Sequence, residues 1–345
     1  MPQIGPMTSQ PRTYQSPKKR VLLLGATGTI GRATARALAA RGDDVVCFVR
    51  SSSAVDTDGA RHRLQAKLGD VDIRLGEAAD PKSLRSADLR GEGFDALVSC
   101  LASRTGAPKD AWAIDYQAHA DALAVAKEAG IPQFVLLSAI CVQKPRLEFQ
   151  KAKLAFEKLL IESGLAYSIV RPTAYFKSLS GQIDRLRKGK PFLLFGNGEL
   201  TSCKPISDAD LASFLADCLS KSDRRNKILP VGGPGDAITP REQGELLFEL
   251  LGRPVQFRSI PIGLVRTVVS TMSGLTWVMP ALAEKAEFAR IAHYYATESM
   301  LAWDPISGAY SESATPSYGR DTLRAHYQYV IESGSSISLR EHAMF

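Results

Sequence analysis

Apolar runs alternate with segments of helical composition along the first half of the chain, and this alternation predicts the fold. The runs are short, continuous and bounded by glycine or polar residues, as in strands buried on both faces of a parallel sheet. They occupy residues 20–25, 44–49, 71–75, 94–100, 133–138 and 166–170. Helical composition separates them at residues 28–41, 110–129 and 147–163. This order predicts an α/β fold with a doubly wound parallel sheet.

The second half of the chain has a looser, mixed pattern. Helical composition covers residues 178–188, 207–219, 239–251, 261–303 and 319–331, and short strands are expected at 192–195 and 201–206. Residues 239–242 form a capping box at the start of one of these helices. We therefore expect a disordered leader, a sheet domain and a smaller lobe packed on the sheet edge, at residues 1–17, 18–175 and 176–345.

The net charge of +7 comes from 43 lysines and arginines against 36 acidic residues, and it is concentrated at one end. Residues 1–42 hold seven cations and no acid, so the rest of the chain is balanced. A balanced body argues against a nucleic-acid-binding protein. The five cysteines are widely spaced and form no CxxC motif. This argues against disulfides, a zinc site or an iron–sulfur cluster, and it favours a reducing intracellular compartment.

The first expected strand ends in a glycine-rich loop, Gly25-Ala26-Thr27-Gly28-Thr29-Ile30-Gly31, which opens a helix. Glycines let the backbone turn tightly and approach a pyrophosphate, and the helix N-terminus offers free N–H groups to the phosphates. Because the loop follows an apolar strand and begins a βαβ unit, it predicts a dinucleotide site in a Rossmann fold. The residues expected to contact the cofactor here are Gly25, Thr27, Gly28, Thr29, Ile30 and Gly31.

The end of the second strand indicates which dinucleotide binds. NAD sites usually have an acidic residue there, whereas this chain has Arg50 followed by Ser51. A guanidinium pairs with a 2′-phosphate and a serine can hydrogen-bond it, so we predict NADPH, with no flavin or metal in the protein. Arg32, just after the loop, is expected to assist. Further cofactor contacts are expected near the ends of later strands, at Glu77, Leu101, Ala102, Pro172 and Thr173.

The fifth strand and the helix after it carry a catalytic pattern. Ser138 ends the strand, and Lys153 lies on the helix four residues after Phe149. This layout resembles the short-chain dehydrogenase/reductase superfamily, which has a serine there and the motif Tyr-x-x-x-Lys. The resemblance implies catalytic roles for Ser138 and Lys153, and Lys153 would also hold the nicotinamide ribose. Phe149 replaces the proton-donating tyrosine, which argues against ordinary alcohol or ketone chemistry.

Longer blocks narrow the resemblance to one family. Those at 137–145, 147–154, 171–179, 200–207 and 315–323 look like the divinyl chlorophyllide 8-vinyl-reductases. The resemblance implies NADPH-dependent reduction of the 8-vinyl group of a divinyl (proto)chlorophyllide to ethyl, in chlorophyll or bacteriochlorophyll synthesis. A vinyl group has no oxygen to protonate, and the macrocycle delocalises the negative charge, so the missing tyrosine suits this chemistry. The candidate proton donors are Tyr175 and, through water, Lys153.

A flat tetrapyrrole substrate needs a broad apolar slot and a cation for its propionate. The uncharged stretch 268–283 is the expected wall of this slot, and no run reaches the roughly 18 apolar residues of a transmembrane helix. No histidine is selected as a ligand of the substrate's magnesium. The residues expected to contact substrate, as apolar walls or cationic anchors, are Phe149, Phe176, Lys177, Lys204, Arg266, Met272 and Trp277.

Two other interpretations fit the same cofactor site. One is a reductase of another conjugated C=C bond, and the other is a non-catalytic NADP-binding sensor or scaffold of the NmrA-like kind. Residues 1–17 look unlike a chloroplast transit peptide, so we expect the cytoplasm of a photosynthetic bacterium. Contact with a membrane periphery, the oligomeric state (monomer or homo-oligomer) and the preferred precursor stay open.

Overall fold

A seven-stranded parallel sheet forms the centre of the computed structural model, which describes residues 17–50, 58–86, 92–275 and 283–334. The strands lie in the order β3-β2-β1-β4-β5-β6-β8. Their bounds are β1 Arg20–Leu24, β2 Asp44–Val49, β3 Asp72–Leu75, β4 Ala96–Ser99, β5 Gln133–Leu137, β6 Ala166–Pro172 and β8 Lys227–Val231. The predicted doubly wound sheet is confirmed. Nearly all of the expected leader lies outside the described residues.

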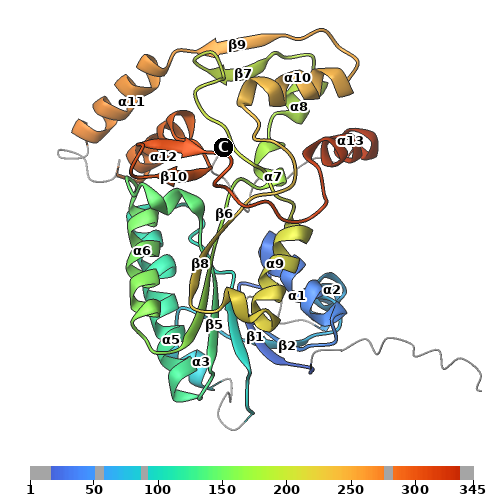
Figure 1. Ribbon diagram of the computed structural model, residues 1–345, viewed down its shortest axis with the longest axis vertical. Coiled ribbons are helices and arrows are strands. Elements are labelled where there is room, and N and C mark those ends of the chain that lie inside the picture. Colours follow the sequence, from blue (N-terminus) through green and yellow to red (C-terminus); the bar gives the residue numbers. More distant parts are fainter. Residues whose placement is uncertain (1–16, 51–57, 87–91, 276–282, 335–345) are drawn as a thin grey trace, which may run out of the picture.

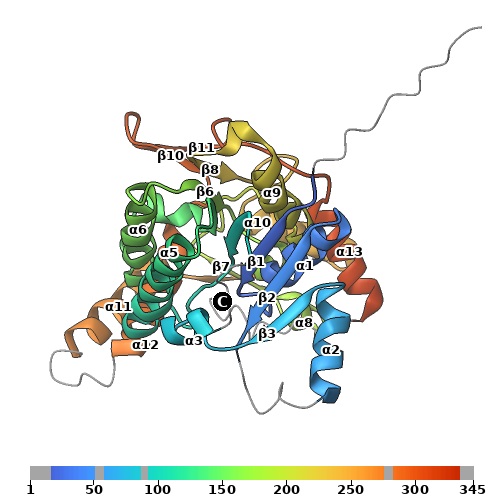
Figure 2. The same cartoon turned by 90° about the horizontal axis from the view of Figure 1, so that it is seen from below.

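Helices cover both faces of the sheet (Figures 1 and 2). On one face, α1 (Thr29–Ala40) and α9 (Asp208–Ser220) pack against the sheet in one core cluster. On the other, α3 (Pro81–Ser86), α5 (His119–Glu128) and α6 (Glu148–Ile161) pack in a second cluster. Helix α2 spans Asp58–Leu68. The strands are apolar on both sides because both sides are covered.

The helix expected over residues 110–129 is built from three pieces. A short α4 (Pro108–Ala111) continues into a π-helix, η1 (Trp112–Ala118), and then into α5. π-Helical turns are rare and occur mostly at functional sites, because the wider turn redirects side chains. Here the turn carries Asp115, which is buried. A short 3-10 helix, η2 (Ile140–Gln143), follows β5.

The second half of the chain lies mainly beyond the carboxyl ends of the strands (Figure 1). Its helices are α7 Phe176–Leu179, α8 Ile183–Arg187, α10 Pro240–Leu250, α11 Ile262–Leu275, α12 Ala283–Thr297 and α13 Leu323–Ser333. Two small sheets join β7 Phe192–Phe195 to β9 Phe257–Ile260, and β10 Ala302–Asp304 to β11 Ala309–Ser311. A 3-10 turn, η3, spans Ser222–Arg224. Within the described residues, no helix is long and apolar enough to cross a membrane.

One expectation for this half was wrong, and one strand was missed. Residues 201–206 do not form a strand, since Cys203 makes only isolated bridges, to Ile238 and Met300. The region 261–303 is mostly helical within the described residues, as expected, with α11 and α12 preceding β10. The seventh strand, β8, was missed because its short apolar run contains Pro230, and a proline within a sheet is confined mainly to edge strands. Strand β8 pairs with β6 at the edge of the sheet, and its residue Val231 packs in the same core cluster as α9. The proposed division of the chain at residue 175 stays a prediction.

Candidate active site

The glycine-rich loop has the close backbone approach that a pyrophosphate site requires. Gly25 has a φ of +77°, and a Cβ there would lie 2.6 Å from the carbonyl carbon of Cys100. A Cβ on Gly31 would lie 2.0 Å from the carbonyl oxygen of Gly25. A Cβ on Gly28 would make only an ordinary 3.5 Å contact, so at this position the loop itself has room. Ile30 is buried in the core beneath the loop rather than exposed on its surface.

Helix α1 directs its positive end to this loop. Gly28 is the N-cap and offers no capping side chain, and the first turn contains no acidic residue. The ammonium of Lys177 donates to the hydroxyl of Thr29 at 3.0 Å, and Arg32 donates to the carbonyl of Thr27 at 2.6 Å. Two cations and a helix N-terminus therefore surround the loop, and these residues fit the phosphates of a nicotinamide dinucleotide.

At the adenosine end, Arg50 and Glu77 form an ion pair. Nε of Arg50 lies 2.9 Å from Oε2 of Glu77, and the side chains are 61% and 42% exposed. The structure thus brings together two residues that the sequence placed on the cofactor separately. Ser51 lies outside the described residues. Leu101 follows β4 beside the loop, with its backbone nitrogen 2.8 Å from a Cβ built on Gly25, and Ala102 beyond it is exposed.

Lys153, which is expected at the nicotinamide from the sequence, forms a buried ion pair that the sequence did not predict. Its Nζ lies 2.9 Å from Oδ1 of Asp115, with the two side chains 10% and 0% exposed. The same oxygen accepts from the backbone N–H of Ser103 at 3.2 Å, whereas Oδ2 has no hydrogen-bond partner within the described structure. Asp115 was missed because a single acidic residue on an Ala-rich helix gives no local signal of its partner on α6.

A buried histidine extends this cluster. His119, one turn after Asp115, lies 2.9 Å from the hydroxyl of Ser99 and 2.9 Å from the carbonyl of Ile114. Burial and the positive charge of Lys153 lower the pKa of His119 to about 4. The imidazole is therefore neutral at physiological pH, and Asp115 is the carboxylate that neutralises Lys153.

Ser138 belongs to a different buried network. Its hydroxyl donates to Oε1 of Glu157 at 2.5 Å, and Nε of Arg171 lies 3.2 Å from the same oxygen. Glu157 is 2% exposed, so the network lies between α6 and β6. Ser138 is not among the residues that line the apolar pocket described below. The structure therefore gives Ser138 a carboxylate partner, and its catalytic role stays a prediction.

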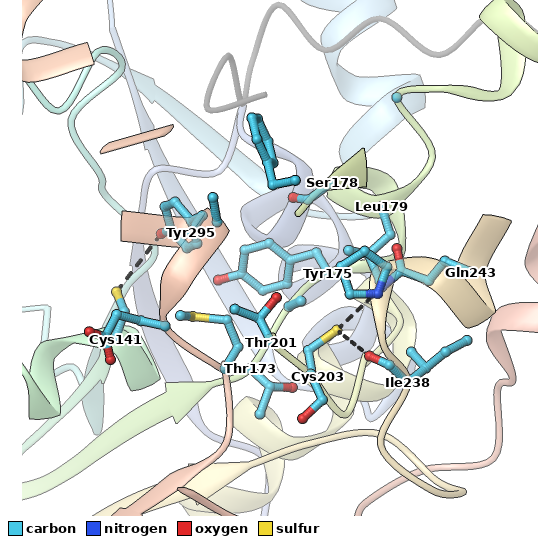
Figure 3. Close-up of a pocket in the computed structure, with 18 of the residues that line it drawn as sticks. Cys141, Thr173, Tyr175, Ser178, Leu179, Thr201, Cys203, Ile238, Gln243 and Tyr295 are labelled. Carbon is cyan, nitrogen blue, oxygen red and sulfur yellow. Dashed lines mark hydrogen bonds between the residues drawn. The ribbon is translucent and has the colours of Figure 1, made fainter. Parts of the chain in front are cut away.

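An apolar pocket of about 300 Å³ opens beyond the ends of β5 and β6 (Figure 3). Ala139, Pro172 and Thr173, which lie at the carboxyl ends of β5 and β6, are among its lining residues, and a Rossmann fold binds its ligands at this edge of the sheet. Its other walls come from the second half of the chain. They include Leu179 of α7, Leu193 of β7, Thr201, Cys203, Gln243 of α10, Tyr295 of α12 and Met300. The pocket therefore joins the two halves of the chain.

Two tyrosines supply hydroxyl groups inside this apolar pocket. Tyr175 follows β6, and Figure 3 shows its ring within the pocket, with Tyr295 across from it. The hydroxyl of Tyr295 donates to Sγ of Cys141 at 3.9 Å. Burial raises the pKa of both phenols above the ordinary value of 10. Both stay protonated at neutral pH, so each can donate a proton or a hydrogen bond. Tyr295 was missed because its helix gave no reason to single out one aromatic.

The other residues expected at the substrate lie elsewhere. Phe149 is buried in a cluster with Ile291 of α12, and Phe176 packs on His326 with ring centroids 5.4 Å apart. Lys177 reaches the glycine-rich loop, and Lys204 accepts a hydrogen bond from Thr173 through its carbonyl. Met272 and Arg266 lie on α11 away from the pocket lining, and Trp277 lies outside the described residues. Among the described residues, no group of three or more His, Cys, Asp or Glu could hold a metal ion.

Comparisons with known proteins agree with this geometry. A family described as NAD(P)H-binding matches residues 25–222, which include the loop, Lys153 and the strands between them. The crystal structure of the NADPH-dependent quinone oxidoreductase QOR2 from Escherichia coli superposes with a TM-score of 0.65. That match covers 90% of this chain and 99% of the other at 19% identity, so it shows the fold alone. The site binds a nicotinamide cofactor.

Two curated relatives are far more similar in sequence. The chloroplastic divinyl chlorophyllide a 8-vinyl-reductase of Arabidopsis thaliana is 45% identical over 335 residues, covering 95% of this chain and 80% of that protein. The enzyme of the same name from Zea mays is 47% identical over 329 residues, covering 94% and 82%. The similarity spans the loop, the Lys153 helix and the pocket walls of the second half. The chain therefore belongs to the divinyl chlorophyllide a 8-vinyl-reductase family.

Proposed function

We propose that this protein reduces the 8-vinyl group of 3,8-divinyl chlorophyllide a, or of its protochlorophyllide precursor, to an ethyl group with NADPH. The observation that carries this is the apolar pocket, which begins at the nicotinamide end of the cofactor site and is enclosed by both halves of the chain. Such a pocket suits a flat, largely apolar substrate with few polar contacts. The identity to the plant reductases, across the segments that form this pocket, supports the same substrate.

In this mechanism the protein must deliver one proton. The cofactor, when bound, supplies a hydride to the vinyl carbon, and the substrate macrocycle takes up the charge that remains. Tyr175 is our proposed donor, because it lines the pocket beside the residues expected at the nicotinamide. Burial raises the pKa of its phenol, so the proton would pass only to a strongly basic centre, such as the carbanion that hydride addition leaves on the substrate. Lys153, fixed by Asp115, is placed to hold the nicotinamide ribose. Exclusion of water by the apolar walls protects the charged substrate from side reactions.

The preference for NADPH rests on Arg50. Its guanidinium lies at the end of β2, where the 2′-position of the adenosine ribose is expected. Glu77 holds Nε of Arg50 and thereby orients the guanidinium for a phosphate. The carboxylate also adds a negative charge nearby, so Arg50 must outweigh Glu77 for NADPH to be preferred. A cytoplasmic, bacterial setting stays an expectation from the sequence.

The test is to incubate the purified protein with NADPH and 3,8-divinyl chlorophyllide a and to follow the Soret band. Loss of a conjugated vinyl group is expected to shift the band to the blue, and omission of NADPH should abolish the shift. If the band does not move although NADPH binds, the protein is a cofactor-binding sensor or a reductase of another conjugated substrate.

Tyr175→Phe tests the proton donor. Loss of a general acid is expected to lower kcat by about 100-fold or more, with a changed solvent isotope effect. Tyr295→Phe is the matched control in the same pocket, and it should alter KM more than kcat. Unchanged turnover and an unchanged isotope effect in Tyr175→Phe would exclude Tyr175 as the proton donor.

A further inference from the structure

The short helix α7 lies between the cofactor loop and the substrate pocket. Tyr175, just before it, and Ser178 and Leu179 within it line the pocket (Figure 3). Lys177, from the same turn, reaches to the first residue of α1 instead. One four-residue element therefore contacts both sites, through different side chains.

Lys177 contacts the N-terminus of helix α1 through a side-chain hydrogen bond. Its Nζ donates to Oγ1 of Thr29 at 3.0 Å, across 148 positions of sequence. Thr29 begins α1, whose first turn lacks acidic residues and whose N-cap, Gly28, has no side chain to cap the backbone N–H groups of that turn. Both the helix terminus and the ammonium attract negative charge. An anion bound by these N–H groups would lie within reach of Nζ.

Backbone hydrogen bonds next to Lys177 fix the position of the start of α7. The N–H of Phe176 donates to the carbonyl of Ile206 at 3.3 Å, and the N–H of Ile206 donates to Ala174 at 2.9 Å. Phe176 itself is buried in the core of the second half. Movement of Lys177 toward a bound anion would therefore pull on α7 as a whole, and with it on the pocket wall.

We propose that Lys177 binds the pyrophosphate of the nicotinamide cofactor, and that α7 thereby couples cofactor binding to the wall of the substrate pocket. This assigns Lys177 to the cofactor, not to a substrate propionate. The pyrophosphate is common to NADPH and NADH, so the effect of Lys177 should be the same for both. The inference deepens the proposed function but rests on it only for the identity of the substrate.

Dissociation constants for NADPH and NADH, measured by fluorescence without substrate, test the first part. Lys177→Met keeps the aliphatic stem and should weaken both cofactors by a similar factor, about 10-fold for a lost charged hydrogen bond. Lys177→Arg should restore much of this binding, and the difference should shrink at high salt. Lys190→Met, an exposed lysine after α8, is the matched control and should change neither constant.

The second part is tested by the affinity for 3,8-divinyl chlorophyllide a with and without NADP⁺. The wild-type protein should bind the pigment more tightly when NADP⁺ is present, and Lys177→Met should lose most of this gain at saturating cofactor. Unchanged cofactor affinities with a raised KM for the pigment would overturn the proposal, because Lys177 would then anchor the substrate. Weakened cofactor binding with full coupling would overturn the role of α7. Since cofactor affinity needs no pigment, failure of the proposed reaction would be seen separately.

Discussion

Breaking the buried ion pair between Asp115 and Lys153 should destabilise the protein strongly. Asp115→Asn keeps the shape of the side chain and the acceptor for Ser103, but it leaves the Lys153 ammonium without its anion. Both side chains are almost fully removed from water, so solvent cannot replace the lost partner. Loss of one member of such a pair costs about 3–5 kcal/mol of unfolding free energy. That is a large part of the 5–15 kcal/mol typical of a folded protein.

A double substitution separates stability from activity. Lys153→Met alone should cost a similar amount, because it leaves the Asp115 carboxylate buried and unpaired. The combination of Asp115→Asn with Lys153→Met removes both charges, and it should recover most of the lost stability, to within about 2 kcal/mol of the wild type. Reduction of the pigment should not recover, because the lysine that we propose holds the nicotinamide ribose is still absent.

Urea unfolding, followed by tryptophan fluorescence and far-UV circular dichroism, measures these differences for the four proteins. The slope of each transition must stay constant for the comparison to hold. Destabilisation below about 1 kcal/mol in both single variants would refute the argument, because it would place the pair in the range of exposed ion pairs. A loss of unfolding free energy in the double variant equal to the sum of the two single losses would also refute it. Such losses add only when two residues do not interact.

Three further predictions concern the cofactor site and its surroundings. Arg50→Ala should raise the KM for NADPH sharply and leave that for NADH almost unchanged, as measured by steady-state kinetics with each cofactor. Gly31→Ala should destabilise the fold, because its Cβ meets a backbone oxygen at 2.0 Å, whereas Gly28→Ala should fold normally and bind NADPH weakly. The pKa of His119 is lowered to about 4 in the folded protein, so between pH 6.5 and pH 4 the unfolded chain binds a proton that the folded protein does not. The free energy of unfolding should therefore decrease by about 3 kcal/mol as the pH falls through this range.

Each of these has a control in the chain. Equal changes in KM for NADPH and NADH in Arg50→Ala would show that Arg50 does not bind the 2′-phosphate. The KM for NADPH of Glu77→Gln shows whether Glu77 orients Arg50 for the phosphate or opposes the phosphate by its charge. Normal thermal stability of Gly31→Ala would contradict the steric argument. For the histidine, His119→Asn should flatten the fall in stability between pH 6.5 and 4 relative to wild type. If both proteins fall in parallel, carboxylates elsewhere cause the acid sensitivity.

The sequence could predict the sheet and the loop because both depend on local signals. A strand covered on both faces needs an unbroken apolar run, and a pyrophosphate loop needs glycines at fixed spacing. The strands β1, β2, β5 and β6 were expected within a few residues of their bounds. β8 was not, because it is an edge strand whose short apolar run contains Pro230.

The side-chain partners could not be predicted, since they depend on how distant segments meet. Lys177 was expected at the substrate as a cation for its propionate, and nothing in its segment indicates Thr29 as its neighbour. The same holds for Asp115, which a π-helical turn directs toward α6. Spacing along one element predicts which residues share a face, but it does not predict what the opposite element presents.

The packing around Phe149 suits a phenylalanine at the position where the Tyr-x-x-x-Lys motif has its tyrosine. Phe149 and Lys153 lie one turn apart on α6, yet the phenylalanine ring packs in a buried cluster with Ile291, which the second half of the chain contributes. A hydroxyl there would be buried among apolar side chains and would carry a desolvation cost. The lysine instead has a buried carboxylate, Asp115, as its partner. Tyr175 enters the pocket from the end of β6, next to the residues expected at the nicotinamide. The absence of a tyrosine at position 149 therefore favours our proposal that the proton for carbon comes from another wall of the pocket, with Tyr175 as its donor.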